Sequence, residues 1–196
     1  GDNFKPIPSS VGTMRSQYGQ NRFDKIGGPK TGAWDSGVYS EKRISATGNK
    51  IAVLSIVPNR IDCIYMVGFT DDTPATFSSA PTYTHLDYCF YFRQGVSAGY
   101  GTWQIYQDGQ PAKWANSNAN IVGVYQVGMT FQIIWDGVNG KIDYNIPPGS
   151  MGNNGTQVPI NALSVPSKYK SGTFGVSSSF FFPVQGQTKF VTLRSG

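Results

Sequence analysis

Hydrophobic and polar residues alternate along much of this chain, with the period of two that characterises β-strands. In "TFQIIWD", Phe131, Ile133 and Trp135 fall on one side of a strand and polar or smaller residues fall on the other. The segment "KIDYNI" alternates in the same way after a turn at Asp136–Gly140. The pattern predicts an antiparallel hairpin with one face in a core and the other face toward solvent.

The same reading predicts further strands between residue 31 and the end of the chain. The segments are "GAWDSGVYSEKRIS", "KIAVLSIVP", "IDCIYMVGFT", "LDYCFYFRQG", "TWQIYQDGQPAKW", "GVYQVGMTFQ", "ALSVP", "GTFGVSSSFFFPV" and "TKFVTLRS". Asp108-Gly109 is a strong hairpin signal within one of them. Roughly ten to twelve strands at this spacing, with no helix longer than a turn or two, indicate an all-β, two-sheet antiparallel sandwich.

Residues 1–29 show neither strand nor helix periodicity. They are polar and basic and contain Gly, Pro and Ser, which is typical of an extended N-terminal arm or linker lying along the body or along a neighbour. The sequence thus predicts two parts: the arm at 1–29 and a β-sandwich domain at 30–196.

Composition supports the β-fold and excludes many enzyme classes. The 24 Gly, 12 Pro and 14% aromatic residues disfavour long helices. Glu41 is the single glutamate among 11 acidic residues, and His85 is the single histidine. A pair of catalytic glutamates and a site built on two histidines are therefore impossible. The carboxylate pairs that remain are Asp71-Asp72 and Asp108 with Asp136, and a solvated loop is the better interpretation of the first.

We accordingly expect no catalysis, no metal and no cofactor. Asp71-Asp72 with loop carbonyls is the only candidate for Ca²⁺, and it lacks the spacing of a calcium loop. The net charge of +5 comes from cations spread thinly along the chain, so specific nucleic-acid binding is not expected. No hydrophobic stretch has membrane-spanning length, so membrane insertion is not expected either. Cys63 and Cys89 are either two buried free thiols or one bridge between neighbouring strands.

The order of several segments resembles SPRY and concanavalin-like sandwiches. "WDSGVYSEKRI" resembles their opening strand, and "YMVGFTDD" resembles their "vG" strand. "VYQVGMTFQIIWDGVNGKIDY" is similar to their late hairpin, and "FGVSSSFFFPVQGQTKFVTL" to their closing strands. The resemblance covers roughly residues 31–193. It implies a jelly-roll sandwich that binds a partner, as in viral and phage fibre tips, carbohydrate-binding proteins (lectins) and intracellular peptide-recognition domains.

A ligand site is expected in "GYGTWQIYQDGQPAKWANSNAN", which combines aromatic rings with amides and a carboxylate. Sugars stack on such rings while their hydroxyls bond to polar side chains. Alternation places Trp103 in the core and makes Gln104 with Tyr106 the exposed pair. Trp114 lies either at the rim of the site or under its own loop. The candidate residues are Tyr100, Gln104, Tyr106, Asp108, Trp114, Asn116 and Asn118.

Three functions are consistent with these features. The leading hypothesis is non-catalytic recognition of a glycan or cell-surface receptor at an extracellular or virion surface, as in adhesion or a tail fibre. The second is a coat or filament subunit, a homo-oligomer assembled through the arm and aromatic patches such as Phe180–Phe182. The third is an intracellular SPRY-type peptide-binding module.

Overall fold

The computed structural model describes residues 4–10, 13–17, 22–27, 33–58, 60–73, 75–77, 82–95, 98–115, 117–148, 150, 160–182 and 187–195. Within these ranges lie sixteen strands and one short 3-10 helix, η1 (Tyr83–His85). The strands are β1 (Phe4–Pro6), β2 (Thr13–Gln17), β3 (Arg22–Gly27), β4 (Ser36–Ser40), β5 (Ile44–Ser45), β6 (Ile51–Pro58), β7 (Ile64–Thr70), β8 (Tyr88–Gln94), β9 (Gly101–Gln107), β10 (Gln110–Pro111), β11 (Val122–Tyr125), β12 (Phe131–Asp136), β13 (Lys141–Asn145), β14 (Asn161–Pro166), β15 (Thr173–Phe182) and β16 (Gln187–Ser195).

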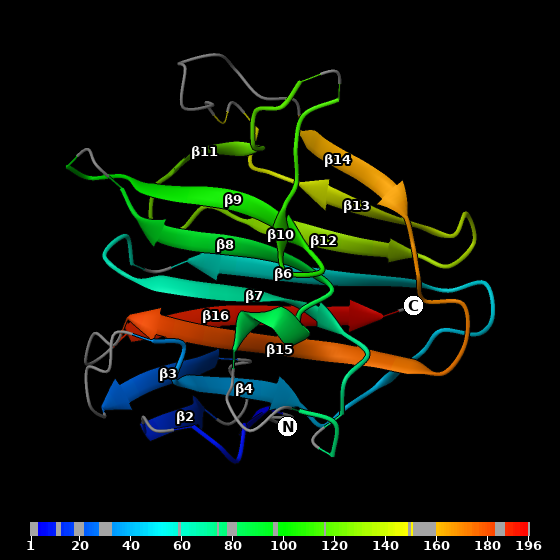
Figure 1. Cartoon of the computed structure of the whole chain (residues 1–196), viewed down its shortest axis with the longest axis horizontal. Coiled ribbons are helices and arrows are strands. Elements are labelled where there is room, and N and C mark those ends of the chain that lie inside the picture. The colour runs from blue at the N-terminus through cyan, green and yellow to red at the C-terminus, as the bar shows by residue number, and fades with distance from the viewer. Residues whose placement is uncertain are drawn as a thin grey trace.

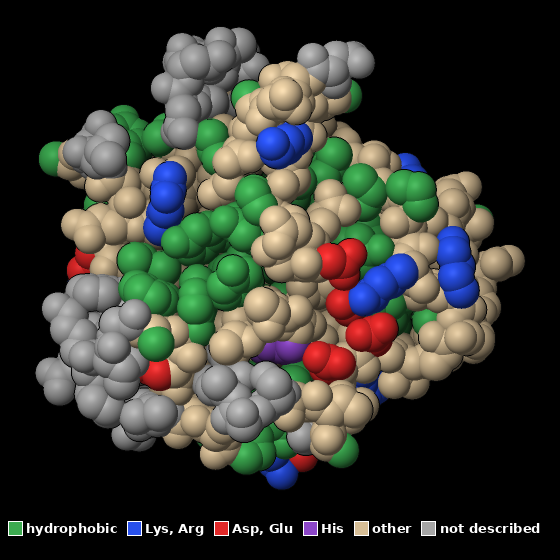
Figure 2. All heavy atoms as spheres, in the orientation of Figure 1, with side chains coloured by type: hydrophobic (Ala, Val, Ile, Leu, Met, Phe, Trp, Pro, Cys, Tyr) green, Lys and Arg blue, Asp and Glu red, His purple; other side chains and the backbone are tan. Residues whose placement is uncertain are grey.

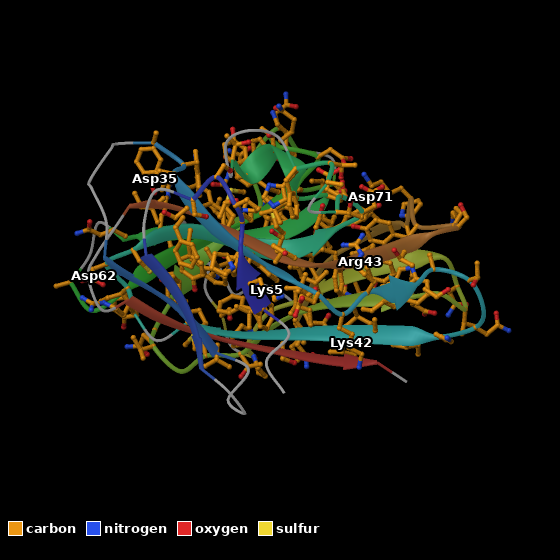
Figure 3. The ribbon with its side chains drawn as sticks, turned by 90° about the horizontal axis from the view of Figure 1, so that it is seen from below. Lys5, Asp35, Lys42, Arg43, Asp62 and Asp71 are labelled. Atoms are coloured by element: carbon orange, nitrogen blue, oxygen red, sulfur yellow. The ribbon has the colours of Figure 1, made fainter. Side chains whose placement is uncertain are left out.

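The strands form two antiparallel sheets, which confirms the predicted sandwich. The larger sheet has nine strands in the order β1-β4-β15-β7-β8-β9-β10, with β11 also paired to β9 and β5 to β15. The smaller sheet has seven strands in the order β14-β13-β12-β6-β16-β3-β2. The larger sheet faces the viewer in Figure 1. Seen from below, the sheets are separate layers with side chains packed between them (Figure 3).

The main core lies between the sheets and is largely aromatic. Phe131, Ile133 and Trp135 of β12 are at most 1% exposed, as their alternation predicts. The Phe131 ring lies 5.2 Å from that of Phe90 and 5.1 Å from that of Phe92, both on β8 of the opposite sheet. Each such buried side chain contributes about 1.5–3 kcal/mol to folding. The hydrophobic space between the sheets is therefore filled, and a ligand site has to lie on an outer face or at an end.

Both predicted hairpins are present. Asp108 (φ +48°) and Gly109 (φ +76°) form the two-residue turn between β9 and β10, where left-handed backbone is required. In the turn between β12 and β13, the Asp136 carboxylate accepts bonds from the backbone N–H groups of Val138 and Asn139, both at 3.0 Å. The Asn139 amide donates a third bond at 2.7 Å. The turn is thus closed by one side chain.

The first 29 residues contribute three strands. β1 pairs with β4 in the larger sheet, while β3 pairs with β16 and β2 with β3 in the smaller one. The described residues of this segment are extended and lie along the body, although their sequence lacks a strand pattern. The domain boundary near residue 30 remains a prediction.

Cys63 and Cys89 are both buried free thiols, the first of the two alternatives. Cys63 belongs to the core between the sheets, whereas Cys89 belongs to a second, smaller hydrophobic cluster on the outer face of the larger sheet. The sheet itself separates the two sulfur atoms.

Candidate functional site

The outer face of the larger sheet carries a group of partly exposed aromatic side chains. Met66, Leu86 and Cys89 are buried at its base. The rings above them come from five separate segments of the chain and are called the aromatic face here: Trp34, Tyr83, Tyr91, Tyr106 and Phe181. Figure 2 shows hydrophobic side chains gathered over β7, β8 and β9, left of the centre of this view.

The five rings form one connected array. The Trp34 ring centroid lies 5.0 Å from that of Tyr83, 6.0 Å from that of Tyr91 and 5.5 Å from that of Phe181. The Tyr106 ring lies 5.5 Å from that of Tyr91 and 6.1 Å from that of Tyr83. All pairs are tilted or edge-to-face, the arrangement that aromatic quadrupoles favour. The array is therefore packed and ordered, while each ring keeps an edge or a face toward solvent.

His85 holds η1, and with it Tyr83, against the sheet. Nδ1 of His85 donates to the Thr82 carbonyl, and Nε2 lies 2.7 Å from the hydroxyl of Ser177 on β15. The Thr70 hydroxyl donates to the His85 carbonyl at 2.6 Å. Burial lowers the pKa of His85 from its ordinary value. These bonds give His85 a structural role in positioning η1 on the sheet.

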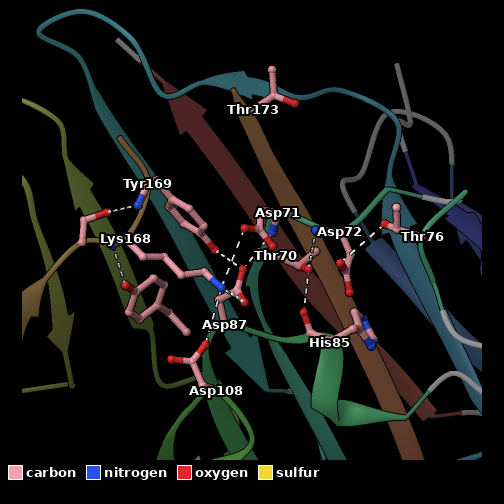
Figure 4. Close-up of polar contacts among 12 residues, drawn as sticks. Thr70, Asp71, Asp72, Thr76, His85, Asp87, Asp108, Lys168, Tyr169 and Thr173 are labelled. Atoms are coloured by element: carbon pink, nitrogen blue, oxygen red, sulfur yellow. Dashed lines mark hydrogen bonds and ion pairs between the residues drawn. The ribbon is translucent and has the colours of Figure 1, made fainter. Parts of the chain in front are cut away.

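A charged cluster lies at one end of the aromatic face, where β7 ends and β8 begins. The Lys168 ammonium contacts the carboxylate of Asp87 and lies 3.5 Å from Asp108 and 3.8 Å from Asp71 (Figure 4). Asp87 also accepts bonds from the Tyr169 hydroxyl and the Asp71 backbone N–H, both at 2.8 Å. We call Lys168 with these three aspartates the Lys168 cluster.

In this cluster, burial and ion pairing shift the pKa values of the charged groups in opposite directions. Burial raises the pKa of Asp87, and the bonds from Lys168, the Asp71 N–H and Tyr169 offset only part of that rise. Burial alone would lower the pKa of Lys168, but the neighbouring carboxylates, Asp87 above all, raise it. The Lys168 ammonium group therefore occupies the position between the carboxylates that a metal cation would take. In the part of the chain that the structure describes, no three His, Cys, Asp or Glu side chains are grouped to hold a metal ion.

Arg43 fixes the loop that carries Asp71. Its guanidinium donates to the backbone carbonyls of Asp72 at 2.8 Å, Asp71 at 2.9 Å and Thr173 at 3.1 Å. Burial lowers the pKa of this guanidinium. Figure 3 shows Arg43 and Asp71 near the same end of the sandwich. Asp71 and Asp72 lie in a loop after β7, as the sequence predicts.

The structure places two of the sequence-predicted site residues, Gln104 and Tyr106, on one face of β9. Tyr106 belongs to the aromatic face. Gln104 shares that side of the strand but is only 5% exposed, which corrects its expected exposure. Its neighbours across the ladder are Tyr91 and Val122, and flanking side chains of this size cover the amide. Tyr100, 41% exposed, lies about 20 Å from Tyr106 along the extended chain.

The other predicted residues lie elsewhere. Asp108 is part of the Lys168 cluster. Trp114 is partly buried and packs against the main core, so the structure gives it the position under its own loop. Asn118 is exposed in that loop, beyond β10, and Asn116 lies outside the described residues. The structure therefore brings Tyr106 and Asp108 near each other and separates Tyr100 and Trp114 from them.

Four rings of the aromatic face were missed by sequence reasoning: Trp34, Tyr83, Tyr91 and Phe181. For two of them, Tyr91 and Phe181, the alternation of residues in the sequence indicated an outward position. In "LDYCFYFRQG" aromatic residues occupy both sides of one strand, so one set had to point away from the core. Phe180 and Phe181 likewise point to opposite faces, with Phe180 stacked on Tyr65 in the core at 5.7 Å. Trp34 and Tyr83 come from irregular segments, where no periodicity assigns a face.

Described residues at the ends of the sandwich line two hollows. One, of about 510 Å³, is open and lies between the turns at 46–49 and 137–140, with Tyr169 and Lys170 on its wall. The other, of about 260 Å³, is lined by Ile61, Asp62, Gln94, Gly95, Ala98, Gly99 and Tyr100. The second hollow continues the β9 side of the larger sheet beyond the aromatic face.

Asp108 and Asp136, one of the two carboxylate pairs considered from the sequence, have different partners. Asp108 interacts with Lys168, whereas Asp136 is bonded within its own turn. Hydrogen bonds from Asn139 and Val138 hold the pKa of Asp136 below its usual value. Across the described ranges, no helix has the length and apolar character needed to cross a membrane.

Comparison with known proteins identifies the fold. No protein-family model matches the chain, and no curated protein matches it in sequence. Among solved structures, the chain is similar to the SPRY domain of human HERC1, with a TM-score of 0.51, 13% identity and 91% of each chain covered. It is also similar to the potassium-bound carbohydrate recognition domain of Emp46p, with a TM-score of 0.53, 10% identity, and 97% of this chain and 88% of the other covered. The chain has the concanavalin-like sandwich fold.

Proposed function

We propose that the chain is a non-catalytic recognition module that binds a glycan through the aromatic face of its larger sheet. The observation that carries the proposal is the five-ring array on the solvent side of a sheet whose other side already packs a complete core. Rings held at the surface keep apolar area in water, which is typical of a binding surface. A pyranose can stack on such rings, and the three tyrosines supply hydroxyl groups beside them.

The fold supports this proposal without naming the ligand. A carbohydrate recognition domain shares the sandwich at 10% identity, as does a SPRY domain at 13%. The extracellular or virion-surface location, with a receptor glycan as the partner, belongs to the proposal and comes from the resemblance in the sequence. We also propose, from the single glutamate and the occupied histidine, that the module binds its partner without transforming it.

A glycan array followed by titration calorimetry tests the proposal. We expect Tyr91→Ala and Tyr106→Ala each to weaken binding at least about tenfold, because central aromatic side chains dominate such interfaces. Val127→Ala is the control, because Val127 is an exposed apolar residue in the turn between β11 and β12. Unchanged unfolding transitions in all variants are required. Equal binding by wild type and both tyrosine variants would contradict the proposed site.

Two alternatives are tested by the same preparations. A peptide ligand, suggested by the shared fold with a SPRY domain, predicts binding to a peptide library and none to the array. A coat or filament subunit that buries the aromatic face against a second copy predicts assembly in sedimentation that Tyr91→Ala abolishes. Deleting residues 1–29 is not a clean test of assembly, because it would remove three strands that pair within the two sheets.

A further inference from the structure

Arg93 lies at the end of the aromatic face opposite the Lys168 cluster. It belongs to β8, where it is paired with Thr102 of β9, and its side chain is exposed. The Arg93 guanidinium carbon lies 6.0 Å from the centre of the Tyr91 ring. This position is within the range of a cation–π interaction and directs the guanidinium along the array.

Among the described residues, Arg93 differs from the other arginines with placed side chains. Arg60 forms a two-bond pair with Asp62, and Arg43 donates to three backbone carbonyls. For Arg93, the described ion pairs and hydrogen bonds include no carboxylate and no carbonyl partner. Its planar set of N–H donors is therefore available at the edge of a candidate binding surface.

Charge changes sign along the aromatic face. At the Lys168 cluster, three carboxylates surround one ammonium, so that end is negative at neutral pH. Arg93 lies six positions after Asp87, which directly precedes β8, and six positions are about 20 Å of extended chain. Figure 2 shows acidic and basic side chains gathered to the right of the hydrophobic group. A ligand lying along β8 would meet a cation at one end and net negative charge at the other.

We infer that the ligand is an acidic saccharide whose carboxylate or sulfate group binds Arg93 while its sugar rings lie on the aromatic face. The inference rests on the proposed function. Arginine suits both anions because its fork of N–H groups matches paired oxygens in two parallel bonds. The negative end repels the same group, so the charges fix the direction in which the ligand lies.

The test compares matched neutral, carboxylated and sulfated forms of one oligosaccharide by titration calorimetry. Wild type is expected to prefer an acidic form at least about tenfold, as for one charge-assisted bond pair. Arg93→Gln removes that preference and leaves affinity for the neutral form within about twofold. Arg93→Lys keeps part of it, because lysine retains the charge and loses the fork. The carboxylated and sulfated arms distinguish the two sources of the anion.

Lys170→Gln is the matched control. Lys170 is an exposed cation beside the turn at 137–140, away from the aromatic face, and its loss changes the net charge by the same amount. An equal effect of both substitutions would assign the preference to overall charge and overturn the inference. Binding of the neutral form as tightly as the acidic forms would overturn it and leave the proposed function standing. Binding of no saccharide in any arm would overturn both.

Discussion

The side chain of Asp136 stabilises the turn between β12 and β13. Its carboxylate accepts three hydrogen bonds inside the hairpin, two from backbone N–H groups and one from the Asn139 amide. These bonds lower its pKa in the folded state. A carboxylate with a depressed folded pKa contributes stability above its unfolded pKa and loses that contribution as the pH falls through the folded value.

We therefore expect Asp136→Ala to lower the free energy of unfolding by about 1–2 kcal/mol at pH 7. The difference from wild type should shrink as the pH falls below about 4, where the carboxyl group is protonated in the unfolded chain. Urea unfolding at pH 7 and at pH 3 measures both values. Asp72→Asn is the control, because the Asp72 carboxylate forms no ion pair seen among the described residues and Asn can accept its one bond, from Thr76 at 3.4 Å. A difference that stays constant across pH would contradict this account of the turn.

Alternation assigned the sides of residues correctly in the hairpin and in β9. Trp103 and Ile105 are fully buried, and Gln104 points the other way with Tyr106. Alternation does not predict how exposed each side chain is, because exposure depends on which side chains of the adjacent strands lie beside it. Tyr91 is the neighbour that matters for Gln104, and it lies on a different strand. Aromatic side chains on the outer face of a sheet thus reduce the exposure of the polar side chains beside them.

Strand packing around Gly68 explains why the "vG" pattern of β7 needs glycine. A Cβ at this position would lie 1.9 Å from the Tyr88 carbonyl oxygen and 2.6 Å from Cα of Cys89. Both atoms belong to the backbone of β8, so neither can move without opening the ladder. Strands β7 and β8 therefore approach closely at the point where the aromatic face is anchored by Cys89.

Gly68→Ala should destabilise the protein by about 3 kcal/mol, as severe overpacking does. Gly128→Ala serves for comparison, because it has φ +90° and open space around it, and only the backbone cost of about 1–2 kcal/mol applies. Chemical denaturation of both variants gives the two values. A smaller loss for Gly68→Ala than for Gly128→Ala would show that β7 and β8 are farther apart than described.

The Lys168 cluster joins three connections between strands: the loop after β7, the turn after β9 and the segment before β15. Lys168→Met removes the cation and leaves Asp87 buried beside two other carboxylates. We expect the free energy of unfolding at pH 7.5 to fall by about 1–3 kcal/mol. Loss of the cation raises the folded pKa of Asp87 further, so the deficit should diminish as the pH falls through that pKa and the group takes up a proton.

Denaturation of Lys168→Met at pH 7.5 and pH 5 tests whether the loss of stability becomes smaller as the pH falls. Lys170→Met is the matched control, because Lys170 is exposed two residues away and forms none of the ion pairs seen among the described residues. We expect it to behave like wild type at both values. A deficit of Lys168→Met that grows on acidification would contradict the assigned role of the cluster.

The sequence pattern did not predict the three N-terminal strands or the Lys168 cluster. β2 and β3 have no alternating pattern in their sequence, yet they pair with each other through the backbone. The Lys168 cluster unites residues nearly a hundred positions apart, and only the topology reveals it. Strands with a strong pattern, such as β6, β12 and β13, were predictable because each packs one face into the core.

For the whole molecule, sequence pattern was sufficient for the architecture but not for the partner. A chain with many alternating segments and few charged residues must close hydrophobic faces against each other, and a two-sheet sandwich does so. The proposed binding surface consists of rings from five separate segments that meet only after folding. The aromatic face is therefore a property of the fold.

Backbone amide NMR of the folded chain, titrated with the best-binding saccharide from the array, tests the central claim most directly. We predict that shift changes concentrate in β8, β9 and η1, on and beneath the aromatic face, and extend to Arg93 when the saccharide is acidic. Changes confined to the turns at 46–49 and 137–140, or to the smaller sheet, would contradict the account.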